Sequence, residues 1–173
     1  MNDIILENIK YMLYQRGYLG NIIEKKDESI WIISKTVEEN LLLYDSYLPK
    51  INIEVLRYVL KKMQSNNITH GIILYQNGIT PSFQKGVEYM TNYRIEYFCI
   101  KEFEFRMTDL YYYCPHEKIK DKQKEIQIKE MYGIQNIPIL LKMDPICRYF
   151  GFMRGDVIQI LRKDNTLAYR IVK

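Results

Sequence analysis

Few residues in this sequence of 173 amino acids have the types and spacing that chemistry requires. Cys114 and His116 flank Pro115 and offer two metal ligands, but a structural zinc site needs four. No Cys-x-x-Cys or His-x-x-x-His pair completes the set. The isolated Cys147 is typical of a small buried apolar side chain rather than of a nucleophile. Since no serine-nucleophile elbow, Walker loop or dinucleotide fingerprint occurs either, the sequence gives no reason to expect catalysis, a metal ion or a cofactor.

One segment has the chemistry to hold a phosphate. In Thr80-Pro81-Ser82, Thr80 is a helix cap and Pro81 a first helical residue, where its missing N–H costs nothing. A helix start directs free backbone N–H groups and a partial positive charge outward, and Lys85 lies one turn further on. Most helix starts contact only water, so the sequence allows two interpretations of this segment, a phosphate contact or a solvated helix start.

Apolar periodicity predicts the elements that would carry these residues. The charged segment 24–28 is interpreted as a solvated loop. In segment 94–107 we expect a strand with Ile95, Tyr97, Phe103 and Phe105 facing inward. The other elements predicted for the first two thirds are helices over 3–16 and 53–65 and strands over 30–34, 41–44 and 68–75.

The last third has its own set of elements. Residues 108–116, rich in Tyr and broken by Pro115, are typical of a linker, and alternating charges predict a helix over 117–132. A short edge strand at 137–141, a helix from Asp144 to Gly151 and a hairpin over 157–172 follow. We therefore expect a mixed α+β chain with an N-terminal domain over 1–107 and a C-terminal domain over 117–173.

Composition sets the broad class. An apolar share of 47% and a charged share of 27% are those of a globular protein. Residues 111–173 contain 12 basic and seven acidic residues, too mild a surplus to indicate a dedicated nucleic-acid binder. Three widely spaced cysteines argue against a disulfide framework, and the charged first twenty residues fit neither a signal peptide nor a membrane span. A soluble intracellular protein is expected.

The densest pattern lies between Asp144 and Tyr169-Arg170. The order Asp-Pro-x-x-Arg-Tyr-x-Gly-x-x-Arg-Gly-Asp-Val-x-x-Ile-x-Arg, followed by Tyr-Arg, resembles the C-terminal domain of the fifth subunit shared by eukaryotic RNA polymerases I, II and III. A small component of the archaeal polymerase resembles the same domain. Segments 12–18, 67–73, 78–82 and 108–116 are similar to the eukaryotic subunit in the same order, which favours a eukaryotic or large-DNA-virus source.

This resemblance implies a non-catalytic subunit of a multisubunit DNA-directed RNA polymerase. The C-terminal domain would dock on the largest subunit, and the N-terminal domain would form an α/β jaw-like part beside downstream double-stranded DNA. Thr80, Pro81, Ser82 and Lys85 would lie near that DNA, in contacts blind to sequence. No membrane partner is implied. The residues that match the assembly motif are Asp144, Pro145, Arg148, Tyr149, Gly151, Arg154 and Gly155.

Details of this expectation remain open. Tyr149 is expected to be an exposed interface anchor, but Tyr149 and the glycines have the alternative role of building the domain. The N-terminal part is shorter than in typical eukaryotic members, which favours a viral polymerase. Localisation would be the nucleus for a cellular protein, and the virion or the viral factory in the host cytoplasm for a viral one.

A free-standing nuclease-like DNA-binding protein is the rival hypothesis. The family's N-terminal domain is similar in fold to some restriction endonucleases, which need two or three carboxylates and a lysine converging on a divalent metal. Glu24, Asp27, Glu28 and Lys35 are the nearest candidates. The usual Asp followed by Glu-x-Lys on a strand is absent, however.

Overall fold

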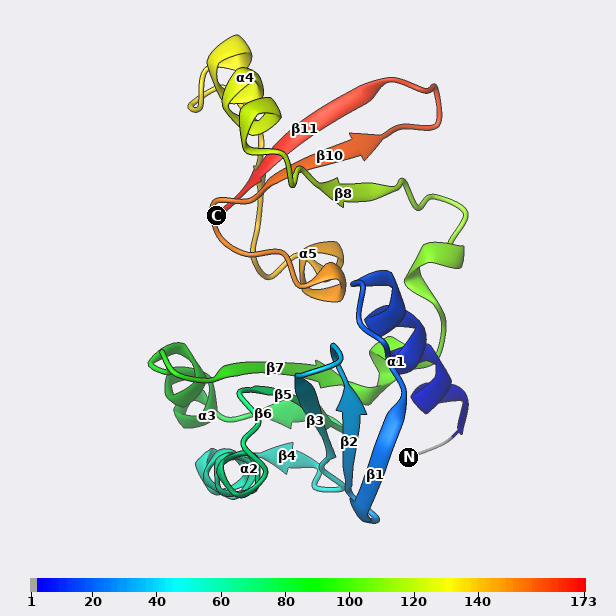
Figure 1. Cartoon of the computed structure of the whole chain (residues 1–173), viewed down its shortest axis with the longest axis vertical. Helices are drawn as coiled ribbons and strands as arrows, with labels where there is room; N and C mark the ends of the chain where they lie inside the picture. The colour runs from blue at the N-terminus through cyan, green and yellow to red at the C-terminus, as the bar shows by residue number, and fades with distance from the viewer. Residues whose placement is uncertain (1–2) are drawn as a thin grey trace. The chain divides into compact units, whose positions relative to one another are not determined.

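The computed structural model describes residues 3–173, and the chain divides into an N-terminal unit that ends at Phe105 and a C-terminal unit, Arg106–Lys173 (Figure 1). Each unit has its own sheet and its own apolar core. The expected mixed α+β class is therefore confirmed. No helix within residues 3–173 is long and apolar enough to cross a bilayer.

Five strands form the N-terminal sheet. The first three are antiparallel, and the third, fourth and fifth are parallel. All residues of the second strand are buried, as expected of a strand whose sheet is covered on both faces. A separate pair of short parallel strands joins β4 (Lys50–Ile51) to β6 (Gly78–Ile79). The main sheet has the order β1 (Ile22–Asp27), β2 (Ile30–Ser34), β3 (Asn40–Asp45), β5 (His70–Tyr75), β7 (Arg94–Cys99).

Helices cover the two faces of this sheet. On one face, α2 (Ile53–Ser65) and α3 (Pro81–Glu88) bury apolar side chains against strand residues such as Ile32 and Leu42 (Figure 1). On the other face lies α1 (Asp3–Gln15), whose Ile9, Met12 and Leu13 are fully buried. The Asn8 side chain donates to the carbonyl of Phe103 (2.9 Å), which ties α1 to the 3-10 helix η1 (Ile100–Phe103) that follows β7.

A smaller sheet organises the C-terminal unit. Its strand order is β8 (His116–Lys118), β10 (Val157–Leu161), β11 (Leu167–Val172), β9 (Ile139–Leu140), with β9 parallel to β11 and the other pairs antiparallel. Helix α4 (Lys122–Tyr132) packs Ile128 against one face, and α5 (Pro145–Phe150) packs Cys147 against the other. Val157 packs in the apolar cluster around Ile128, and Ile158 packs in the cluster around Cys147. Successive residues of β10 therefore contribute to the cores on opposite faces of the sheet.

Two charged segments were assigned wrongly from the sequence. Residues 24–28, expected as a loop, mostly belong to β1, an edge strand whose residues are all exposed. The helix predicted over 117–132 begins only at Lys122, after Asp121 caps it, because residues 116–118 pair with β10. Neither segment has an apolar pattern, since these edge strands are formed by backbone pairing with a neighbour.

The segment after β7 also differs from the prediction. The strand ends at Cys99, and a 3-10 turn then reverses the alternation, so Phe103 is buried as expected while Phe105 is exposed. Phe98 is buried in its place, with its ring 5.3 Å from that of Phe103. The predicted linker over 108–116 contains the last two residues of the 3-10 helix η2 (Met107–Asp109) and the first residue of β8, all within the C-terminal unit. The domain boundaries stay an expectation.

Candidate functional site

Helix α5 is built by the motif residues themselves. The Asp144 side chain caps it by accepting the N–H of Ile146 (2.9 Å), and Pro145 occupies the first turn. Gly151 ends the helix with φ 67° and ψ 31°, in the left-handed region that glycine enters without cost. Its N–H donates to the carbonyl of Arg148 (3.1 Å). The capping and termination of α5 are therefore sufficient to explain why aspartate, proline and glycine occur at positions 144, 145 and 151.

The turn that leads into β10 presents the second half of the motif. Gly155 has φ +90° and donates its N–H to the carbonyl of Val172 (2.9 Å), which joins the turn to the end of β11. The Asp156 carboxylate accepts the N–H of Met153 (2.8 Å) and pairs with Lys118 (2.8 Å). Arg154 is exposed at the tip of this turn. These hydrogen bonds and the ion pair fix the backbone of the turn, which exposes the Arg154 side chain.

The two remaining motif residues lie within α5. Arg148 is half-buried. Tyr149, which we expected to be exposed, is buried, with 6% of its surface accessible, so that expectation is wrong. Its ring lies edge-on to that of Phe150 (5.1 Å), which in turn stacks on Phe152 (5.4 Å). Two of these rings lie at the end of α5 and the third follows Gly151, so the three pack on one another, which favours burial of Tyr149 over exposure.

The start of α3 has the predicted geometry. Thr80 caps the helix by accepting the N–H of Phe83 (3.3 Å), and its hydroxyl lies 3.0 Å from that of Ser82. Pro81, Ser82 and Lys85 are exposed, while Phe83 is fully buried and fixes the helix on the sheet. The four residues that sequence reasoning selected therefore lie together on the first turn and a half of one helix.

The carboxylates of the nuclease hypothesis make local contacts instead of converging. Glu24 pairs with Lys26 (2.8 Å), Asp27 accepts the N–H of Ser29 (2.8 Å), and Lys35 pairs with Glu39. Among residues 3–173, no three His, Cys, Asp or Glu side chains are grouped so that they could hold a metal ion. No geometric observation therefore favours the rival hypothesis.

Sequence reasoning missed a buried ionic cluster between α1 and β7. The Arg16 guanidinium forms two hydrogen bonds with the Glu96 carboxylate (3.0 and 2.9 Å). Arg94 (3.0 Å) and the Nε2 of His70 (2.7 Å) also contact Glu96. The side chain of Arg16 is only 2% exposed and that of Glu96 15%. No sequence signal marks this cluster, because its members are up to 80 residues apart.

The electrostatics of this cluster follow from burial and charge. Burial alone would raise the pKa of Glu96, but the Arg16 charge, the His70 hydrogen bond and the Arg94 charge hold that pKa far below its ordinary range. Burial lowers the pKa of His70, although its bond to Glu96 opposes the shift. A neutral His70 then donates from Nε2, and its buried Nδ1 has no partner within residues 3–173. The cluster locks the end of α1 to the sheet.

Comparison with known proteins agrees with this arrangement. Residues 105–172 match the family described as RNA polymerase Rpb5, C-terminal domain, and these limits differ by one residue at each end from those of the C-terminal unit. The chain is 29% identical over 130 residues to the DNA-directed RNA polymerases I, II, and III subunit RPABC1 of Caenorhabditis elegans and of Caenorhabditis briggsae. That alignment covers 71% of this chain and 61% of each relative.

A viral relative is also similar. The "Putative DNA-directed RNA polymerase subunit 454R" of Invertebrate iridescent virus 6 is 35% identical over 120 residues, covering 63% of this chain and 64% of the relative. The chain thus spans about three fifths of the length of the curated relatives it matches. The resemblance seen in the sequence is confirmed: this chain is similar to subunit RPABC1 of the DNA-directed RNA polymerases I, II, and III and to a viral polymerase subunit, and its C-terminal unit matches the Rpb5 C-terminal domain.

Proposed function

We propose that this chain is a non-catalytic subunit of a multisubunit DNA-directed RNA polymerase and that it docks on the largest subunit through its C-terminal unit. The observation that carries the proposal is the coincidence of residues 105–172, the matched domain, with a separately folded unit. Within that unit, the motif residues build α5 and the Arg154 turn. Nucleotidyl transfer takes place on the large subunits with their metal ions, and this chain supplies no ligand for them.

Affinity purification of the tagged full-length chain from its native cell or virion tests this proposal. We expect mass spectrometry to find the two large polymerase subunits with the wild-type chain. Arg154→Glu is expected to reduce their recovery at least about tenfold, because reversing an interface charge leaves its partner buried and unpaired. Arg148→Glu is expected to act in the same direction.

Lys122→Glu provides the control, since Lys122 is an exposed cation at the start of α4 in the same unit and lies outside the motif. It should retain the polymerase chains as the wild type does. If the wild-type chain retains no polymerase subunit in mild salt, the proposal is wrong. If all three variants retain the polymerase equally, docking does not use the motif.

We further propose that the N-terminal unit lies beside downstream duplex DNA and that the start of α3 approaches the phosphate backbone. The exposed Ser82 and Lys85 supply a hydroxyl and a cation on one capped helix start. Such contacts are weak, independent of sequence and sensitive to salt. For a cellular protein this role belongs in the nucleus, and for a viral one in the virion or viral factory, which we favour.

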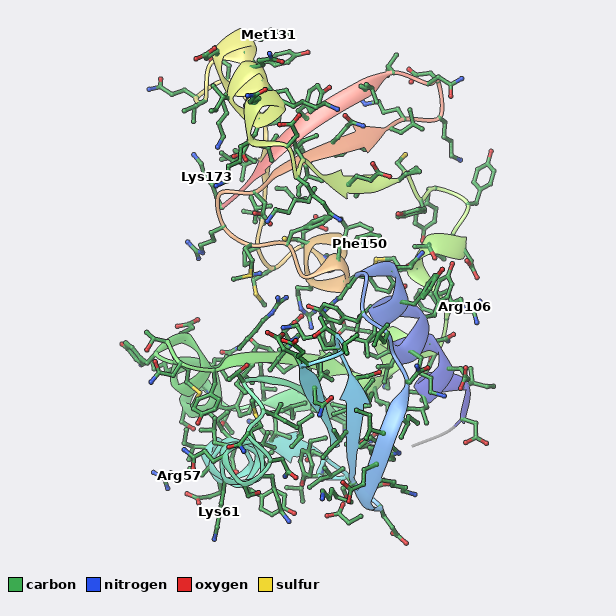
Figure 2. The ribbon with its side chains drawn as sticks, viewed as in Figure 1. Arg57, Lys61, Arg106, Met131, Phe150 and Lys173 are labelled. Carbon is green, nitrogen blue, oxygen red and sulfur yellow. The ribbon has the colours of Figure 1, made fainter. Side chains whose placement is uncertain are left out.

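Lys85→Glu is expected to weaken DNA binding uniformly across sequences and to reduce the slope of log affinity against log salt by about one. The reason is that one phosphate contact releases about one counterion. Fluorescence anisotropy with a labelled duplex and the full-length chain measures both quantities. Lys61→Glu on α2, where Lys61 points away from the unit (Figure 2), should leave the slope unchanged. An unchanged slope in Lys85→Glu would contradict the contact.

A further inference from the structure

The strand β9 leaves one edge of the C-terminal sheet open. In the order β8-β10-β11-β9, β9 pairs only with β11 within residues 3–173. The bonds to β11 use the carbonyls of Pro138 and Leu140 and the N–H of Lys142. Because peptide groups of a strand point alternately to its two sides, the N–H and C=O of Ile139 and the N–H of Leu141 point away from β11. Three backbone groups therefore lie along a free edge.

The side chains on this edge are apolar and accessible. Ile139 is 47% exposed and Leu141 65% exposed. They share one face of the strand, whereas Leu140 between them is buried in the core beside α5. Met143 and Met153 are also exposed, and the Lys142 Nζ lies 3.6 Å from the sulfur of Met153. An open edge with exposed aliphatic side chains is a template for pairing with another strand.

The charge around β9 and the short length of its free edge indicate what kind of strand could pair with it. Residues 134–143 contain no acidic residue, and the cations Lys142 and Lys173 lie at the end of β9, where the Lys173 N–H bonds the Leu140 carbonyl (3.0 Å). A partner strand with an acidic residue at this end would be complementary. Pro138 has no N–H to donate, so pairing is confined to the few residues that follow it. Asp144 and Pro145 of the assembly motif come directly after this segment.

We propose that the free edge of β9 receives a short extended segment of a neighbouring polymerase chain, which adds a fifth strand to the C-terminal sheet. This inference rests on the proposed function, because the partner is a polymerase chain. The incoming strand bonds the backbone of Ile139 and Leu141, places apolar side chains beside theirs, and carries an acidic residue near Lys142 and Lys173. Backbone bonds give affinity, and the exposed side chains give register.

Hydrogen exchange on the purified complex tests the pairing. The full-length chain is compared alone and in the polymerase that it retains, using peptides that span residues 138–143. The amides of Leu140 and Lys142 already bond β11, so strand addition should slow two further amides, those of Ile139 and Leu141, by at least about tenfold. Unchanged exchange in a retained polymerase overturns this inference and leaves the proposed function standing. Failure to retain any polymerase overturns both.

Two variants probe the edge directly. Leu141→Pro removes an N–H that β11 does not use, and the pair Ile139→Lys, Leu141→Lys keeps the backbone but charges the apolar stripe. Both are expected to lower polymerase recovery at least about tenfold. Met131→Lys is the matched control, because Met131 is equally apolar and exposed but lies on α4 (Figure 2). Recovery equal to that of the control overturns the inference, as does concentration-dependent slowing of the same amides in the free chain, which would identify a second copy as the occupant.

Discussion

The substitution Glu96→Gln is expected to lower the free energy of unfolding of the N-terminal unit by about 3–5 kcal/mol. Glutamine keeps the shape of the side chain but removes the charge that compensates Arg16, whose side chain is 2% exposed, and Arg94. A buried cation without a counter-charge is far more costly than the intact pair is favourable. The expected loss of unfolding free energy therefore comes mainly from leaving Arg16 and Arg94 without a counter-charge.

Trp31 makes this measurement specific. It is the single tryptophan of the chain and lies buried in β2, so its fluorescence in urea follows the N-terminal unit. Glu54→Gln, which disrupts an exposed pair with Arg57 on α2, should leave the urea midpoint unchanged within error. The double variant Arg16→Met, Glu96→Gln is expected to recover part of the loss, because it no longer buries Arg16. Equal loss in the single and double variants would contradict this account.

The same cluster predicts how stability depends on pH. The pKa of Glu96 is depressed by folding, so its contribution is complete above the ordinary glutamate pKa of about 4.3 and is lost as pH falls through and below that value. The depressed pKa of His70 acts in the same direction nearer its ordinary value of about 6.5, because the unfolded chain takes up that proton first. The difference in midpoint between wild type and Glu96→Gln should therefore stay nearly constant down to about pH 5 and narrow as pH is lowered from about 5 to about 3. A constant difference would contradict the assigned shift.

The second large effect is expected for Phe83→Ala, at about 3–5 kcal/mol of unfolding free energy. Phe83 is fully buried in the core between α2, α3 and the sheet, and its ring lies 5.5 Å from that of Tyr97, edge to face. Alanine would remove this contact and leave a cavity beneath the helix that carries Thr80 and Lys85.

Tyr89→Ala is the matched control, since Tyr89 follows the same helix but is exposed. We expect it to change the free energy of unfolding by no more than about 0.5 kcal/mol. Trp31 fluorescence again reports the transition. Similar losses in the two variants would mean that α3 is not anchored through Phe83.

Local signals in the sequence were sufficient for many elements. The limits of α2 are those expected, because Asn52 caps its start, the apolar period runs through Met63, and Asn66 follows its end. The same holds for α5 between Asp144 and Gly151 and for the hairpin of β10 and β11 around Asp164 and Asn165. Capping, proline and turn preferences act over a few residues, so the order of residues alone determines them. The family resemblance rests largely on these segments.

Other features required the tertiary structure. β1 and β8 are charged segments that become strands only because β2 and β10 offer them backbone partners. Glu96 lies between Ile95 and Tyr97 on β7 and carries no local signal of its role, which arises because α1 brings Arg16 to it from 80 residues away. Tyr149 is buried by its aromatic neighbours, and the free edge of β9 exists only once β11 has paired with its other side. The pairing of β8, the ionic cluster and the free edge of β9 depend on contacts between segments that are distant in the sequence, whose energies no local pattern contains.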